Sequence, residues 1–355
     1  MQDDVTRGAY APDETDRATW HRGQVARQQE IRPMIDEIRV GLTAVVLSVH
    51  QDQPVVLTAP IQPDGSTATP DHQMAVTRLP AGRFSPKGQA SLESELRDVV
   101  LNAAGMELGY IEQLLTNYDP SGEAEGSKSD RELPQLSVSY MALTRADTTP
   151  LAPGAKWLDC YELLPWEDFR GGRPNVLAGQ ILPGLQDWAS DGEVDIANAP
   201  DGEAPMSRSE RVAVSFGLSG RTWDDQRVVD RFDLLLEAGL INRLGPLPLG
   251  ASDMRLVAAG LGRLRAKTRY RPVVFELLPP EFTLFELQRA VEAVLGPTLH
   301  KQNFRRLVEG TGLVEPTGDV RNNTGGRPAK TYRFRREVLL ERPAPGVHVR
   351  PGRAA

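Results

Sequence analysis

The chain has 355 residues, of which 40% are hydrophobic and 25% are charged, and this is ordinary usage for a protein of two or three domains. No apolar run is long enough to cross a bilayer, and the polar, acidic N-terminus lacks the hydrophobic stretch of a secretory signal, so we expect a cytoplasmic protein without a membrane partner. The net charge of −7 argues against nucleic-acid binding by the chain as a whole, and its single cysteine, Cys160, makes neither an internal disulfide nor a zinc cluster.

Strand and helix signals alternate through the first half of the chain. Gly41–Val49 and Pro54–Thr58 are β-rich and are separated by a polar turn, so together they predict a β-hairpin. Ser91–Ala104 has apolar residues at helical spacing and precedes Gly105, a typical helix stop. The pattern is that of an α+β domain in which helices cover a sheet. Other elements expected here are a disordered lead over residues 1–20, a short helix at 27–38, a turn at Leu79–Gly82, and strands at Tyr110–Asn117 and Leu136–Thr144.

The middle of the chain has weaker signals. An acidic stretch rich in Gly, Pro and Ala, residues 191–206, predicts a loop or linker. Trp223–Leu240 and Ser252–Lys267 predict two helices, and their role is open.

The C-terminal part has the element order of a winged helix. Thr283–Glu286 fits a capping box at the start of a helix, and Gly296 and Pro297 end that helix. A second helix is expected at about Leu299–Glu309, starting near His300, with Phe304 and Leu307 facing inward. Short strands at 313–315 and 331–334 then flank a loop at Gly318–Lys330. In a winged helix the second helix enters the major groove of DNA, and the loop contacts the backbone or the minor groove.

The charge distribution favours a polyanion-binding C-terminal part on an acidic chain. Residues 300–336 contain nine Lys or Arg and only three acidic residues. A solvated basic surface would show the same pattern, so charge alone leaves both interpretations open.

Leu79–Gly82 followed by Glu95–Met106 resembles the Nudix hydrolase box, in which helical glutamates bind Mg²⁺. When the match is anchored at Gly82 and Gly105, two extra residues lie between them compared with the family spacing. The arginine position falls on Asp98 and the early glutamate position near Gly88, and no register restores the acidic set. The three helical glutamate positions fall on Val99, Asn102 and Ala103. The resemblance therefore implies a Nudix-like fold that has lost its catalytic carboxylates and does not act as an enzyme.

The stretch Tyr270–Phe334 resembles the C-terminal domain of the Nudix-related regulators of NAD metabolism, the NrtR-type repressors, and in outline their NadQ-like branch. Four short motifs occur in order downstream of the Nudix-like half. They are Tyr270–Phe275, Phe282–Gln288, Lys301–Arg306 and Gly326–Tyr332.

Independently of this resemblance, the residue types of the C-terminal part favour DNA binding. Asn and Gln at the start of the second helix can read adenine edges, and Arg can bind guanine or phosphate. Gly325 and Gly326 would let the loop approach a duplex closely and bring Arg327 to a minor groove or a phosphate. The candidate DNA-binding residues are Lys301, Gln302, Asn303, Arg305, Arg306, Arg327, Lys330 and Arg333.

The resemblance implies a homodimeric transcriptional repressor of NAD biosynthesis genes that binds a palindromic double-stranded DNA operator. It implies an NAD-related effector, such as NAD, ADP-ribose or ATP, and no required cofactor. Arg83 and Arg97 are the candidate ligand-binding residues, because arginines can neutralise phosphates without a metal.

The expected fold class is α+β, with a Nudix-like α/β/α sandwich followed by a C-terminal winged helix-turn-helix. We expect the sensing and DNA-binding functions to lie in separate hydrophobic cores. The expected segments are a lead at 1–38, a Nudix-like sensor at 39–200, a helical linker or dimerisation segment at 201–268, a winged helix at 269–340 and a tail at 341–355.

Two other functions remain in competition. One is a Mg²⁺-dependent Nudix hydrolase of ADP-ribose or a related nucleoside diphosphate with an appended DNA-binding domain, and the missing glutamates argue against it. The other is a nucleotide-binding adaptor whose basic part contacts RNA or protein. A salt-dependent shift on duplex DNA, with none on RNA, would separate these functions.

Overall fold

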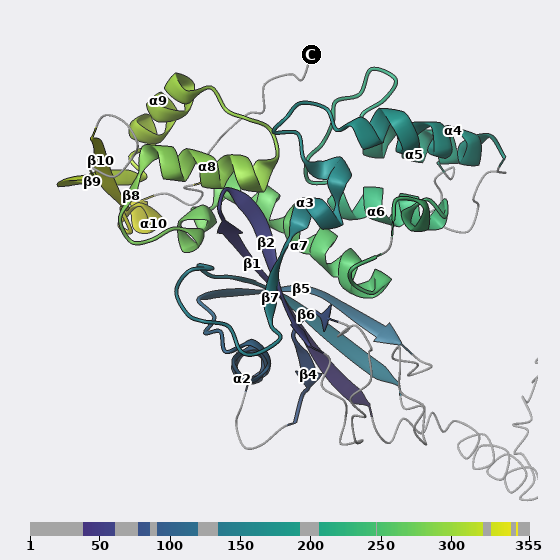
Figure 1. Cartoon of the computed structure of the whole chain (residues 1–355), viewed down its shortest axis with the longest axis horizontal. Coiled ribbons are helices and arrows are strands. Elements are labelled where there is room, and N and C mark those ends of the chain that lie inside the picture. The colour runs from purple at the N-terminus through teal and green to yellow at the C-terminus, as the bar shows by residue number, and fades with distance from the viewer. Residues whose placement is uncertain are drawn as a thin grey trace, which may run out of the picture.

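The computed structural model in Figure 1 describes residues 38–60, 77–85, 91–119, 134–191, 206–245, 247–321, 328–341 and 346. The expected lead, the helix at 27–38, nearly all of the linker at 191–206 and most of the tail lie outside these residues. The strands are β1 (Arg39–His50), β2 (Gln53–Pro60), β3 (Thr77–Arg78), β4 (Ala81–Arg83), β5 (Tyr110–Asp119), β6 (Gln135–Leu143), β7 (Lys156–Asp159), β8 (Phe282–Thr283), β9 (Val314–Arg321) and β10 (Ala329–Phe334). The helices are α2 (Leu92–Ala104), α3 (Cys160–Leu163), α4 (Leu182–Ser190), α5 (Arg208–Phe216), α6 (Val228–Glu237), α7 (Ala251–Tyr270), α8 (Leu284–Leu295), α9 (Lys301–Thr311) and α10 (Val338–Glu341).

The first half of the chain forms a seven-stranded mixed sheet. Its main order is β3-β2-β1-β6-β5, with β4 also pairing with β1 and β7 with β2. β1 and β6 are parallel, and β1 and β2 form the expected antiparallel hairpin. The turn of this hairpin consists of Gln51 and Asp52, which have positive φ angles of 48° and 63° and so match the right-handed twist of the strands. The expected turn at Leu79–Gly82 is shorter than predicted, because Ala81 and Gly82 already belong to β4.

Helices cover both faces of this sheet. Alternation along β1 directs Leu42, Ala44 and Val46 to the face that α2 covers with Leu96 and Val100. The helix is bounded as predicted, because the Ser91 side chain accepts from the amide of Ser94 and Gly105 ends the helix with φ 71°. Figure 1 shows α2 apart from the other helices, across the sheet from α3 and α7. The expected α/β/α sandwich is therefore confirmed.

The middle helices, whose role the sequence leaves open, form the second covering layer. α7 lies directly on the sheet, since a Cβ added at Gly260 would stand 2.8 Å from Cγ1 of Val45. The helix expected at Trp223–Leu240 is shorter in the structure and begins at Val228. α6 packs on α7, so the sequence between the sheet and the winged helix is part of the folded body.

The C-terminal elements form the predicted winged helix. α8 starts in a capping box, in which Thr283 and Glu286 satisfy each other's backbone amides. α9 follows, and β8, β10 and β9 form a three-stranded sheet. The loop between the last two strands is shorter than the expected Gly318–Lys330, because β9 continues to Arg321 and β10 begins at Ala329.

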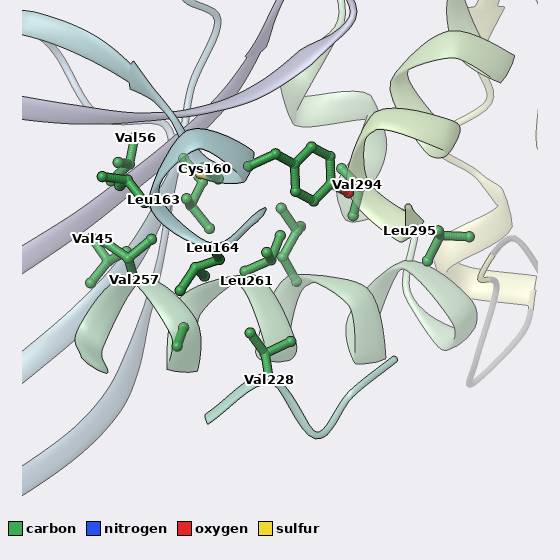
Figure 2. Close-up of a cluster of buried hydrophobic side chains, with 14 of the residues drawn as sticks. Val45, Val56, Cys160, Leu163, Leu164, Val228, Val257, Leu261, Val294 and Leu295 are labelled. Carbon is green, nitrogen blue, oxygen red and sulfur yellow. The ribbon is translucent and has the colours of Figure 1, made fainter. Parts of the chain in front are cut away.

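The winged helix does not have a hydrophobic core of its own, although a second buried cluster lies between α2 and the other face of the sheet. One buried cluster runs from the sheet through α3 and α7 to α8 and α9. Figure 2 shows this continuity, with Val45 and Val56 of the sheet, Leu261 of α7 and Val294 of α8 in one group. α8 contacts β1, β2 and α7 directly, so the winged helix shares its core with the sheet domain.

Candidate nucleic-acid interface

α9 presents a polar, basic face to solvent. Its inward face consists of the buried Phe304 and Val308, as expected for Phe304. The remaining positions of the helix are free to carry polar side chains, because only a narrow stripe packs against α8. The exposed side chains on its first two turns are Lys301, Gln302, Asn303, Arg305 and Arg306. All five predicted DNA-binding residues of this helix therefore lie at the surface.

The start of α9 is held by backbone geometry. His300 stands at the N-cap position, as predicted, and its side chain makes no capping hydrogen bond. Its carbonyl accepts from the amide of Phe304 at 2.9 Å, which begins the helix. On the exposed face, Arg306 donates to the Asn303 side chain at 3.4 Å, so these two side chains can act on one ligand group.

The wing contributes fewer unpaired cations than its sequence suggests. Lys330 is exposed on β10. Arg333 is exposed as well, but its Nε donates to Glu315 of β9 at 2.6 Å, and this hydrogen bond raises the pKa of Arg333. Arg321 donates to Glu286 at 2.5 Å and to the carbonyl of Glu281, which joins the wing to the start of α8. Arg327 lies outside the described residues.

The helix that resembles the Nudix box, α2, has an apolar contact at Val99. A Cβ added at Gly82 would stand 2.7 Å from Cγ2 of Val99, so Val99 packs directly on β4. Valine and alanine offer no oxygen to Mg²⁺, which prefers hard oxygen ligands. Among the described residues, no group of three or more His, Cys, Asp or Glu side chains is arranged to hold a metal ion.

The two candidate ligand-binding arginines have different surroundings. Arg83 is exposed at the end of β4. Arg97 on α2 donates to the backbone carbonyls of Leu108 and Gly109, so its guanidinium already supports the chain that leads into β5. Cys160 is buried, and burial raises the pKa of its thiol.

Several polar residues that sequence analysis did not single out connect the sheet to the winged helix. Gln288 and Glu292 lie four residues apart on the buried face of α8, and Arg289 beside them reaches Asp52 in the β1–β2 turn. The interruption of the apolar stripe of α8 by two polar residues is the signal that could have revealed the pair. Its partners could not be inferred, because Asp52 is 237 positions away from Arg289 in sequence.

The fold and the exposed α9 face define a winged-helix protein joined to a Nudix-like sheet domain. Residues 274–334 match the family described as the NrtR DNA-binding winged helix domain. The predicted resemblance of the C-terminal part to the winged helix of NrtR-type regulators is therefore confirmed over these residues.

A curated relative and two solved structures are similar to this chain. The ADPR responsive transcriptional repressor NtrR of Acinetobacter baylyi is 46% identical over 88 residues, which are 25% of this chain and 35% of the relative. The chain therefore matches about a third of that relative's length. NrtR of Shewanella oneidensis, in complex with a 27mer DNA, is 20% identical, with a TM-score of 0.49 over 85% of this chain and 95% of that chain. A MutT/nudix family protein of Enterococcus faecalis is 14% identical, with a TM-score of 0.46 over 92% of this chain and 100% of that chain.

In the ranges that the structure describes, no helix combines the length and the apolar character needed to cross a membrane.

Proposed function

We propose that this protein is a transcriptional repressor of NAD biosynthesis genes that inserts α9 into the major groove of a palindromic DNA operator. The observation that carries the proposal is the α9 surface, where five polar or basic side chains stand exposed over a buried Phe304 and Val308. Asn303 and Arg305 are the proposed base readers, and Lys301, Lys330 and Arg327 the proposed phosphate contacts. This role places the protein in the cytoplasm.

The proposed effector is ADP-ribose, bound by the Nudix-like domain. The support is the relative from A. baylyi, which is described as ADPR responsive. NAD and ATP are the alternative effectors. Arg83, exposed at the end of β4, is the better placed of the two candidate arginines, because Arg97 already donates to two carbonyls.

The Nudix-like domain is proposed to sense and not to hydrolyse its ligand. The support is the contact of Val99 with Gly82, together with Asn102 and Ala103 at the other glutamate positions. Purified protein should release no AMP or phosphate from ADP-ribose above background in the presence of Mg²⁺. Turnover that EDTA abolishes would favour the hydrolase instead.

The test of the main proposal is selection of DNA from a randomised duplex pool by the full chain, followed by titration of the selected and a scrambled duplex. A palindromic selected site, bound at least about a hundredfold more tightly than the scrambled duplex, is expected for a specific regulator. The same titration with ADP-ribose, NAD and ATP shows which nucleotide is the effector and whether it strengthens or weakens DNA binding. If the chain binds both duplexes equally, or binds RNA equally, the α9 surface is a nonspecific basic surface and the proposal fails.

The protein is further proposed to act as a homodimer, because one winged helix covers a single half-site and a palindrome offers two. Light scattering at micromolar concentration should give twice the chain mass. A monomer both with and without the selected duplex would contradict this.

A further inference from the structure

A buried polar pair on α8 holds the segment that leads into α9. Glu292 and Gln288 are polar, yet they lie on the face of α8 that packs inward and are only 3% and 6% exposed. The Gln288 side-chain amide donates to the Glu292 carboxylate at 2.9 Å. Burial of these groups is costly unless their hydrogen bonds are made, so the pair needs well-defined partners.

The partner of both side chains is one residue, Leu299. The amide of Leu299 donates to Oε1 of Glu292 at 2.8 Å, and its carbonyl accepts from Nε2 of Gln288 at 2.9 Å. Leu299 lies in the connection between α8, which ends at Leu295, and α9, which begins at Lys301. His300, the next residue, makes no side-chain cap, so the Gln288–Glu292 pair holds the backbone as a clamp directly before the start of α9.

The same carboxylate is connected to the sheet domain. Nη1 of Arg289 donates to Oε2 of Glu292 at 3.2 Å, while Nε and Nη2 of Arg289 both lie 3.0 Å from Oδ2 of Asp52. Asp52 has a positive φ of 63° in the β1–β2 turn. Arg170 holds that turn in place by donating to the Asp52 carbonyl and to the side chain of Gln53, both at 2.6 Å.

We propose that Gln288 and Glu292 are positioning residues of the DNA-reading helix α9, and that Arg289 ties this clamp to Asp52 in the sheet domain. The inference rests on the proposed function of α9. By holding both polar groups of the Leu299 backbone, the pair sets the direction in which α9 leaves α8. The tie through Arg289 makes this direction depend on the position of the β1–β2 turn.

Positioning has a consequence that simple stabilisation lacks. Base contacts tolerate little displacement, whereas Coulombic attraction of Lys301, Arg305 and Arg306 to phosphates survives a small rotation of the helix. Loosening the clamp should therefore reduce the preference for one sequence and leave nonspecific binding in place. A residue that only stabilises the fold would instead lower the folded fraction and weaken both kinds of binding together.

The test compares Glu292→Gln and Arg289→Ala with the wild-type full chain. Glu292→Gln keeps the size of the side chain but removes its charge and one of its two acceptor oxygens. The Arg289 side chain is 35% exposed, so this second variant removes less buried contact than a core substitution would. The probes are the duplex selected by the wild type and its scrambled counterpart, each titrated over a range of KCl concentrations. The matched control is Arg255→Ala, which removes an ion pair of similar exposure between α7 and Asp233 of α6.

Each clamp variant is expected to lower the selected-to-scrambled affinity ratio by roughly 3- to 10-fold, which corresponds to the loss of one or two ordinary hydrogen bonds. The salt slope and the affinity for the scrambled duplex should stay as in the wild type, and Arg255→Ala should keep the full ratio.

The outcomes separate the two proposals. If the wild type selects no sequence, the proposed function fails, and this inference fails with it. If the wild type selects a sequence and both clamp variants keep the full ratio, the inference alone is overturned. A loss in Glu292→Gln but none in Arg289→Ala would overturn the tie to the sheet. Should Glu292→Gln not fold, Arg289→Ala decides by the same ratio.

Discussion

At the scale of single residues, Glu167 is a buried charged group held by two arginines. Its carboxylate is fully buried and accepts from Nε of Arg231 at 2.6 Å and from Nη1 of Arg265 at 2.5 Å. Both arginines are also fully buried, and Arg265 donates further to the carbonyl of Val294 at the end of α8. Two cations around one buried anion are stable together because both arginines also donate to backbone carbonyls, and Arg265 donates to the hydroxyl of Tyr161 as well.

Glu167→Gln should destabilise the protein strongly, because it removes the carboxylate that both buried guanidinium groups contact. Loss of one partner of a buried pair costs about 3–5 kcal/mol of unfolding free energy. Urea unfolding followed by circular dichroism measures this loss. Arg255→Ala, which breaks the half-exposed pair with Asp233, is the control and should cost about 0–1 kcal/mol. Similar effects of the two changes would contradict the buried network.

The same residue predicts a pH dependence. Burial by itself raises the pKa of Glu167, but the charges and hydrogen bonds of Arg231 and Arg265 outweigh it, and the net pKa is lowered. The unfolded chain therefore takes up this proton at a higher pH than the folded chain does. The stabilisation is complete above the ordinary glutamate pKa and is lost as the pH falls through that range towards the folded value. Unfolding free energies measured between neutral and acidic pH should fall less steeply in Glu167→Gln than in the wild type.

At the scale of elements, the winged helix divides its cations unequally. The α9 cations Lys301 and Arg305 are exposed, whereas Arg333 on β10 is paired with Glu315. A cation that already has a carboxylate partner neutralises less phosphate charge than one that has none. The helix is therefore expected to contribute more to DNA binding than this strand of the wing.

Arg305→Ala should cost about 1–3 kcal/mol in binding of the selected duplex and relax the preference at one base pair. Arg333→Ala should change the affinity less, because the charge of Arg333 is already compensated by its ion pair with Glu315. Titration of both variants on the selected duplex, with single base pairs exchanged in turn, distinguishes the two effects. An equal loss in both variants without any change in preference would indicate a nonspecific basic surface. Arg327 remains a predicted phosphate contact whose replacement should lower the salt slope by about one.

Local signals made most of these elements predictable from the sequence. The Thr283–Glu286 capping box and the cap at Gly105 are read from a few neighbouring residues, and both are present. The length of β9 was not predictable, because it depends on the pairing of Val320 with Lys330 across the wing. The ion pair of Arg333 with Glu315 was not predictable for the same reason, so the count of Lys and Arg residues overestimated the number of unpaired cations on the wing.

At the scale of the whole molecule, the sheet domain and the winged helix are expected to unfold together. Buried residues of β1, β2, α3, α7 and α8 belong to one cluster, so separating the parts would expose apolar surface on both. The polar contacts of Tyr161 and Arg265 with the carbonyls of Ala293 and Val294 would be lost as well. Sequence analysis placed two cores here because helix and strand periodicity indicates which residues are buried and not against what they are buried.

Calorimetry should accordingly show a single unfolding transition of the described body, with equal calorimetric and van't Hoff enthalpies. Arg289→Ala, at the contact between α8 and the β1–β2 turn, should shift this transition without splitting it. Two resolved transitions in the wild type, one of which moves alone on addition of the selected duplex, would contradict a shared core.

The shared core also bears on how such a protein can evolve. A domain that buries its apolar surface within itself can be copied into another gene and still fold. The winged helix described here would arrive there without the surface of β1, β2 and α7 that covers α8. The winged helix and the sheet domain are therefore expected to be inherited together. Mutations at Asp52 and Arg289 should be tolerated mainly in compensating pairs. A change in DNA preference is therefore expected to arise by substitutions in α9 and not by replacement of the whole winged helix.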